Sequence, residues 1–181
     1  MSAPLRLRVD RTWDGLPLAP GERAEVTLAA DAGGGLRLTV DATYHADPPP
    51  AAPPGPTPRL WEHEAVELFV AGPGGDDVVE YLEVELGPHG HHLVLRLRGV
   101  RWVVESGRPL RYRAVVGDDG RWRGEALLPR GWLPAGPHRA ALFAVHGVGR
   151  GRRWLASVGL GERRGEADFH RPGCFAGVVL P

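Results

Sequence analysis

Glu67, Glu83 and Glu85 are the residues whose types and spacing could do chemistry in this chain. Glu83 and Glu85 alternate in the run EYLEVEL, residues 80–86, so a strand would project both carboxyls from one face, about 6–7 Å apart. Two carboxyls at such a distance could act as the acid and base of a glycosidase, or accept hydrogen bonds from a bound ligand. Any acidic strand meets this criterion, so a solvated face with weak cross-strand ion pairs is the alternative.

The histidines and the cysteine give weaker signals. His89, His91 and His92 lie close together, but on a strand His91 and His92 point to opposite faces, so no metal site is predicted. Cys174 follows His170 by four residues and could be imagined as a nucleophile; a lone cysteine beside an apolar C-terminal strand is more typical of a small buried side chain. The sequence contains no G-x-S-x-G, P-loop, H-E-x-x-H or spaced Cys/His quartet, so an enzyme is not predicted.

The elements that must position these residues are strands. Apolar and polar residues alternate with a period of two in ten short runs, with glycine-rich turn sequences between most of them. The pattern predicts an all-β, antiparallel β-sandwich, jelly-roll-like, with one domain over residues 1–181. The predicted strands cover residues 5–9, 24–30, 36–44, 66–70, 78–86, 92–98, 110–116, 121–128, 141–148 and 153–158.

Two connecting segments have their own signature. The proline-rich run at residues 48–58 cannot enter a sheet interior, because proline lacks the donor and fixes φ, so it is predicted as a surface loop. Residues 129–136 indicate a short helical turn.

The GPHG turn at residues 87–90 predicts how the two strands around it pair. If Pro88 and His89 are the two turn residues, Glu85 faces His92 and Tyr81 faces Arg96. One face of the hairpin would then carry charge, while the other is filled by Leu82, Val84, Leu93 and Leu95.

The composition of the chain limits the classes of binding partner that are expected. The 181 residues have a formal net charge of zero, so neither nucleic acid nor an anionic membrane surface is expected as a partner. No window approaches the roughly 18 apolar residues of a membrane span, and the N-terminus lacks a secretory h-region. A single cysteine excludes an internal disulfide, and we expect a soluble, cytoplasmic protein.

Two segments resemble a known family. WEHEAVELFV, residues 61–70, is similar to the W-E-x-D-x-V-E-I-F-I segment of family-nine carbohydrate-binding modules and of the wider DOMON-like group of sugar- and haem-binding β-sandwiches. EYLEVELGPHG and the terminal ADFHRPGCFAGVVL extend the likeness. In that family two aromatic rings stack on a terminal sugar while polar side chains bind its hydroxyls.

The resemblance implies a small-ligand site. Trp61 matches the first stacking ring, Glu67 the hydroxyl acceptor and Phe169 the second ring, with His170 and Arg171 in the polar segment behind it. The family strand matching residues 81–86 carries an arginine and an asparagine toward the sugar, where this chain has Glu83 and Glu85. The implied site therefore consists of Trp61, Glu67, Tyr81, Glu83, Glu85, Phe169, His170 and Arg171.

The expected function is a non-catalytic module that binds a carbohydrate, with no cofactor and no metal. Three neighbouring carboxyls would raise one another's pKa unless a cation compensates, so the site would favour a cationic or donor-rich ligand. Two alternatives stay open: haem ligated by His146 or His170, and a small glycoside hydrolase that uses Glu67 with Glu83 or Glu85. The candidates for charge compensation are His63, His170, Arg171 and Arg96.

Overall fold

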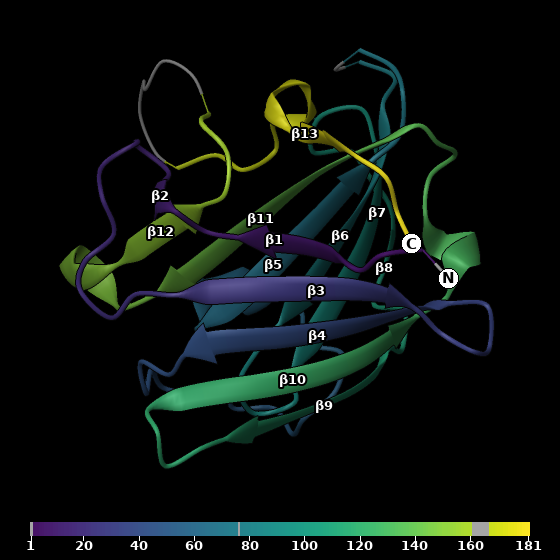
Figure 1. The fold of residues 1–181 in the computed structure, drawn as a ribbon. Coiled ribbons are helices and arrows are strands. Elements are labelled where there is room, and N and C mark those ends of the chain that lie inside the picture. The colour runs from purple at the N-terminus through teal and green to yellow at the C-terminus, as the bar shows by residue number, and fades with distance from the viewer. Residues whose placement is uncertain (1, 76, 161–166) are drawn as a thin grey trace.

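The computed structural model describes residues 2–75, 77–160 and 167–181, and these form two antiparallel sheets (Figure 1). The smaller sheet has the order β1-β3-β4-β10-β9, with β1 Leu5–Arg8, β3 Ala24–Ala30, β4 Leu36–Thr43, β9 Arg111–Val116 and β10 Arg121–Leu128. The larger sheet has the order β2-β12-β11-β5-β6-β7-β8, and β13 also pairs with β11. Its strands are β2 Arg11–Thr12, β5 Ala65–Ala71, β6 Glu80–Leu86, β7 His92–Arg98, β8 Val103–Ser106, β11 His138–His146, β12 Arg153–Ala156 and β13 Ala176–Val178.

This architecture confirms the predicted all-β antiparallel sandwich, and each of the ten predicted runs contains a strand. The sequence pattern missed β2, which has two residues, and β8, whose residues are mostly exposed on both faces and therefore do not alternate. The predicted helical turn is the 3-10 helix η2, Arg130–Trp132, and the proline-rich run lies outside the strands, with one isolated bridge between Pro56 and His92. Among the described residues, no helix is long and apolar enough to cross a membrane.

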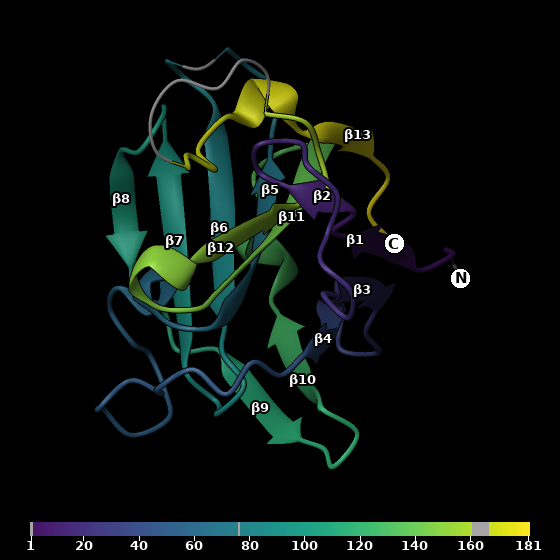
Figure 2. The same cartoon turned by 90° about the vertical axis from the view of Figure 1, so that its left-hand side faces the viewer.

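The main core lies between the two sheets. Alternation sends Leu28 and Leu38 of the smaller sheet toward Leu68 and Val84 of the larger one, and all four are at most 1% exposed. Figure 2 shows β5 to β8 on one side of the molecule and β3 and β4 on the other. Each sheet thus covers one face of its partner.

A second apolar cluster covers the outer face of the larger sheet. It joins Phe69 and Phe143 from the strands to Leu60, Phe169 and Phe175 from segments that cross over the sheet. Every residue of β5 is buried as a result. Antiparallel strands often keep one face in water, but here both faces of β5 and β6 are covered.

The pairing of β6 with β7 differs from the prediction by one residue. The turn holds three residues, Pro88 to Gly90, because the Gly87 amide donates to the His91 carbonyl at 2.9 Å and Gly90 takes a φ of 85°. A glycine with positive φ lets a three-residue loop close the hairpin with a bulge.

This shift corrects the predicted faces. Glu85 lies opposite Leu93, Glu83 opposite Leu95 and Tyr81 opposite Leu97, so the predicted Glu85–His92 and Tyr81–Arg96 pairs are wrong. Leu93 and Leu95 share the face of the glutamates. The carboxyls therefore lie on an apolar face.

Candidate ligand-binding cavity

A cavity of about 440 Å³ lies on the outer face of the larger sheet. Two tryptophans and a phenylalanine, two glutamates, an arginine and a histidine line it, together with small and aliphatic side chains. The lining residues are Trp61, Glu67, Glu83, Leu95, Leu97, Arg101, Val103, Val145, Trp154, Ala167, Phe169 and His170. A concave site with apolar walls and a few polar groups is typical of a small-molecule pocket.

Trp61 reaches the cavity from the 3-10 helix η1, Leu60–Glu62, which immediately precedes β5. Its ring is 43% exposed, whereas Leu60 beside it is fully buried in the outer cluster. Arg152 fixes this helix, because its guanidinium donates to the carbonyls of Trp61, Glu62 and His63. The same arginine directly precedes β12, which carries Trp154, so it links the two tryptophan-bearing segments.

Phe169 can present at most one face of its ring to the cavity. It stacks on Phe143 with centroids 4.2 Å apart and planes 9° apart, and it is only 8% exposed. Trp154, which the sequence did not single out, supplies a second, half-buried indole to the cavity wall.

The three glutamates are buried together. Glu67 of β5 lies directly opposite Glu85 of β6, and Glu83 follows two positions along on the same face. They are 3%, 0% and 2% exposed, respectively, so the alternative of a solvated acidic face is wrong. Among the described residues no donor reaches Oε1 of Glu67 or Oε2 of Glu83, whereas Glu85 interacts with Glu83 and with the Trp61 amide.

Burial controls the protonation of these carboxyls. It raises the pKa of Glu67 to about 8, and the nearby positive charge of Arg152 only partly opposes that shift. Burial also raises the pKa of Glu83 and Glu85 well above the ordinary value, and the negative charge of Glu67 raises them further. Since charged carboxylates are strongly disfavoured in an apolar setting, the cluster is mostly protonated at neutral pH.

A hydrogen-bonded group borders the glutamates. The Tyr81 hydroxyl accepts the Arg101 amide at 3.0 Å and shares a hydrogen bond of 2.9 Å with Nδ1 of His170. Nε2 of His170 lies 3.9 Å from Oε2 of Glu83, too far for a hydrogen bond. Burial and, to a lesser extent, the positive charge of Arg101 together lower the pKa of His170 to about 4, so this imidazole is neutral at neutral pH.

The expected compensating cations lie mostly elsewhere. His63 bonds to the Pro48 carbonyl at 3.1 Å, Arg96 pairs with Glu80 at 3.4 Å, and Arg171 donates to the Leu160 carbonyl. Only His170 lies beside the cluster. The arginines whose charge acts on the carboxyls are Arg101 and Arg152, which sequence reasoning missed because only the fold brings them near.

Of the eight residues predicted for the site, five line the cavity: Trp61, Glu67, Glu83, Phe169 and His170. Tyr81 and Glu85 are buried behind them on the same sheet face, with Tyr81 bonded to His170. Arg171 is exposed, and its side chain is held at Leu160 outside the cavity lining.

Three other candidates have separate roles or surroundings. His91 and His92 are buried and contact the Ala52 carbonyl and the Leu110 amide, and the described residues contain no cluster of three or more metal-ligand side chains. Nε2 of His146 lies 3.0 Å from Glu22, and its ring stacks on His45. The prediction of a buried Cys174 is wrong, because its 3-10 helix, Pro172–Cys174, turns Pro172 and then Phe175 inward and leaves the thiol exposed.

Fold and site together define the chain as a β-sandwich protein with an acidic, aromatic-walled cavity on the outer face of its larger sheet. The chain belongs to the UPF0462 family. It is 39% identical to the UPF0462 protein C4orf33 homolog of Danio rerio over 180 residues, which cover 95% of this chain and 87% of that protein. It is 38% identical to UPF0462 protein C4orf33 of Homo sapiens over 151 residues, 77% of this chain and 68% of that protein.

A solved structure shares the fold. It is a protein from Bacteroides uniformis described as "a putative carbohydrate-binding protein", with a TM-score of 0.65 and 16% identity over 95% of this chain and 84% of that one. No family model matches the chain.

Proposed function

We propose that this chain is a non-catalytic module that binds a carbohydrate of one or two sugar units in the cavity. The observation that carries the proposal is the combination of a half-exposed tryptophan, Trp61, with two buried carboxyls that each keep an oxygen without a hydrogen-bond partner, Glu67 and Glu83, around one cavity. Sugars have apolar C–H faces that pack on indole rings and hydroxyl rims that donate to carboxyl oxygens. The resemblance to family-nine carbohydrate-binding modules and the description of the Bacteroides uniformis protein support the same ligand class.

The alternatives fit the site less well. Haem ligation is less well supported, because His146 lies outside the cavity lining with its ring stacked on His45, and Nδ1 of His170 is already bonded to Tyr81. A glycosidase of the expected kind needs two carboxyls beside the substrate. Glu85 is fully buried outside the lining, which leaves Glu67 and Glu83 as the one pair within reach.

Thermal unfolding with a panel of mono- and disaccharides tests the proposal. A bound sugar at about 100 times its Kd should stabilise the wild type by about 2.7 kcal/mol, and Trp61→Ala should remove that gain, because it deletes the ring on which the sugar packs. Trp102→Ala is the matched control, since Trp102 is 72% exposed and lies outside the lining, and it should keep the gain.

Two results would contradict the proposal. One is a panel in which no sugar stabilises the wild type. The other is glycoside turnover that Glu67→Gln abolishes in a folded protein, which would make the chain a hydrolase.

A further inference from the structure

The cavity is lined by carboxyl oxygens that have no hydrogen-bond partner among the described residues. Glu67 and Glu83 both line it, both are more than nine-tenths buried, and each keeps an oxygen that no described residue reaches with a donor. Buried polar atoms of this kind are rare in native proteins and call for a partner. The ligand is therefore expected to bring hydrogen-bond donors into this part of the cavity.

The nearby arginines do not supply those donors. The guanidinium of Arg152 donates its hydrogen bonds to the carbonyls of Trp61, Glu62, His63 and Gly147. Arg101 pairs with Asp168 at 2.8 Å. Positive charge thus lies close to the carboxyls, while neither guanidinium donates to the unpaired oxygens of Glu67 and Glu83.

An ammonium group would supply these carboxyls with both hydrogen-bond donors and a positive charge. It carries three donors and a full positive charge, and its hydrogen bonds to carboxylates are about twice as strong as those between neutral groups. The indole rings of Trp61 and Trp154, which line the same cavity, add the electron-rich faces to which cations are attracted.

We propose that the ligand carries a protonated primary amino group that is received between the carboxyl groups of Glu67 and Glu83, one of which gives up its proton, which makes an amino sugar the preferred ligand class. The sugar part of this inference rests on the proposed function, whereas the amino part rests on the cavity alone.

Binding is then linked to protons. In the empty cavity the carboxyls hold their protons at neutral pH, so an incoming ammonium displaces about one proton to solvent as its ion pair forms. The titratable and charged groups that face the pair from the surrounding elements are Tyr81 and Glu85 on β6, Arg101 after β7, Arg152 before β12, and Asp168 and His170 in the C-terminal segment.

Calorimetry with matched ligands tests the inference. The probes are glucosamine, galactosamine and mannosamine, each beside its parent hexose and its N-acetyl form, which lacks the charge. Putrescine and 1,4-butanediol form a pair without a sugar ring. At pH 7 at least one amine should bind about ten-fold tighter than its neutral counterpart. Titration in phosphate and in MOPS, which differ in ionisation enthalpy, should report about one proton released.

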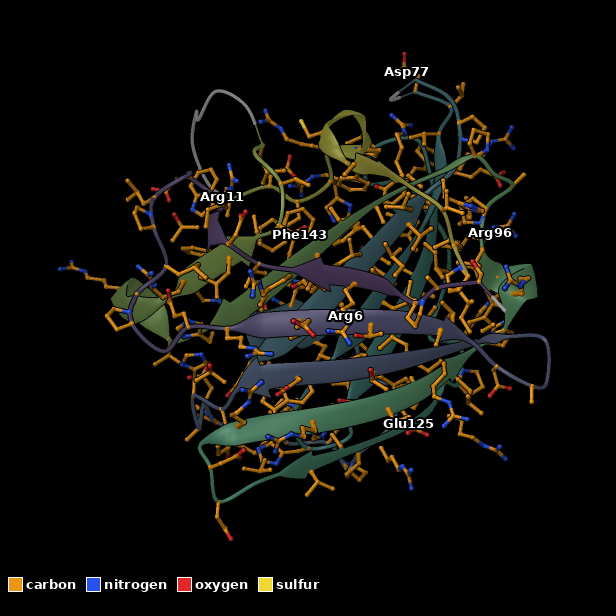
Figure 3. The ribbon with its side chains drawn as sticks, in the orientation of Figure 1. Arg6, Arg11, Asp77, Arg96, Glu125 and Phe143 are labelled. Atoms are coloured by element: carbon orange, nitrogen blue, oxygen red, sulfur yellow. The ribbon has the colours of Figure 1, made fainter. Side chains whose placement is uncertain are left out.

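Isosteric variants show whether Glu67 and Glu83 are the carboxyls that bind the amine. Glu67→Gln and Glu83→Gln each remove one ionisable carboxyl but keep the shape, so each should weaken amine binding at least ten-fold, and the double variant should abolish proton release, with folding checked by circular dichroism. Glu125→Gln is the control, because Glu125 lies on β10 of the other sheet (Figure 3), and it should bind as the wild type does.

Each outcome separates the two proposals. If hexoses or N-acetyl forms bind as tightly as the amines, or if the double variant still releases a proton on binding, the inference fails while sugar binding stands. If putrescine binds and no sugar does, the inference stands and the carbohydrate proposal fails. If no probe binds, both fail.

Discussion

At the scale of single residues, Glu67 carries a stability cost in the wall of the proposed binding site. A buried carboxyl without a donor costs free energy, and it avoids a larger cost by staying protonated. Its ordinary pKa is 4.5 and burial raises that to about 8 in the folded state. The folded protein therefore holds one more proton than the unfolded chain between these two values.

That difference predicts how stability depends on pH. The contribution of Glu67 to the free energy of unfolding should be fully present below about pH 4.5 and fall as pH rises toward about 8, because the unfolded chain releases the Glu67 proton first. Glu67→Gln should reduce this fall by about 1.4 kcal/mol per pH unit. Urea unfolding at pH 5, 6, 7 and 8 measures the slope, with Glu125→Gln as a surface control. A slope that Glu67→Gln leaves unchanged would show that Glu67 is ionised in the folded state.

At the scale of elements, strand β9 of one sheet fixes the turn that sets the register of the other. The Tyr112 hydroxyl on β9 donates to the Gly87 carbonyl at 2.7 Å, at the start of the β6–β7 turn. Gly124 on the neighbouring strand β10 makes room for that ring, since a Cβ there would lie 2.8 Å from Cε2 and Oη of Tyr112. A strand glycine next to an aromatic ring thus supports the hairpin that carries Glu83 and Glu85.

We expect Gly124→Ala to lower the free energy of unfolding by about 1–3 kcal/mol, because the added methyl pushes the Tyr112 ring out of its place. Gly177→Ala on β13 is the matched control, as no atom lies within 4 Å of the Cβ it would add. The control should change stability by less than about 0.5 kcal/mol. Denaturant unfolding compares the two. Equal effects would indicate that the Tyr112 ring moves aside at no cost.

At the scale of the whole molecule, the larger sheet serves two cores. Its inner face packs on the smaller sheet, and its outer face, with Phe69 and Phe143, supports the segments that enclose the cavity. Figure 3 labels Phe143, which belongs to β11 near the middle of the larger sheet. We therefore expect substitutions on the inner face to change stability alone, and substitutions on the outer face to change both stability and ligand affinity.

A pair of truncations tests that separation. Leu38→Ala, in the core between the sheets, should cost about 2–5 kcal/mol while the folded fraction keeps its ligand affinity. Phe143→Ala should cost about 3–5 kcal/mol and also weaken binding, because it removes the ring on which Phe169 stacks. Unfolding and calorimetry on the same samples provide both numbers. Equal losses of affinity would mean that the faces are coupled through the sheet.

The sequence by itself determined the strands and the faces of β5. Alternation with a period of two is a local property, so it located ten strands, and in β5 the same alternation separates Glu67 and Phe69 on one face from Val66, Leu68 and Val70 on the other. The prolines likewise excluded residues 48–58 from the sheets, because their lack of a donor is also local.

Tertiary structure alone decided the register of β6 and the burial of its glutamates. One residue more in the turn moved Glu83 and Glu85 opposite leucines, and that choice depends on the positive φ of Gly90. The outer face is covered by segments that are distant in the sequence and carry Trp61, Trp154 and Phe169. Because of this cover, the glutamates of β6 lie at the base of a cavity instead of in solvent. Contacts between distant segments leave no periodic trace in the chain, so Arg101, Arg152 and Trp154 could not be assigned to the site from sequence.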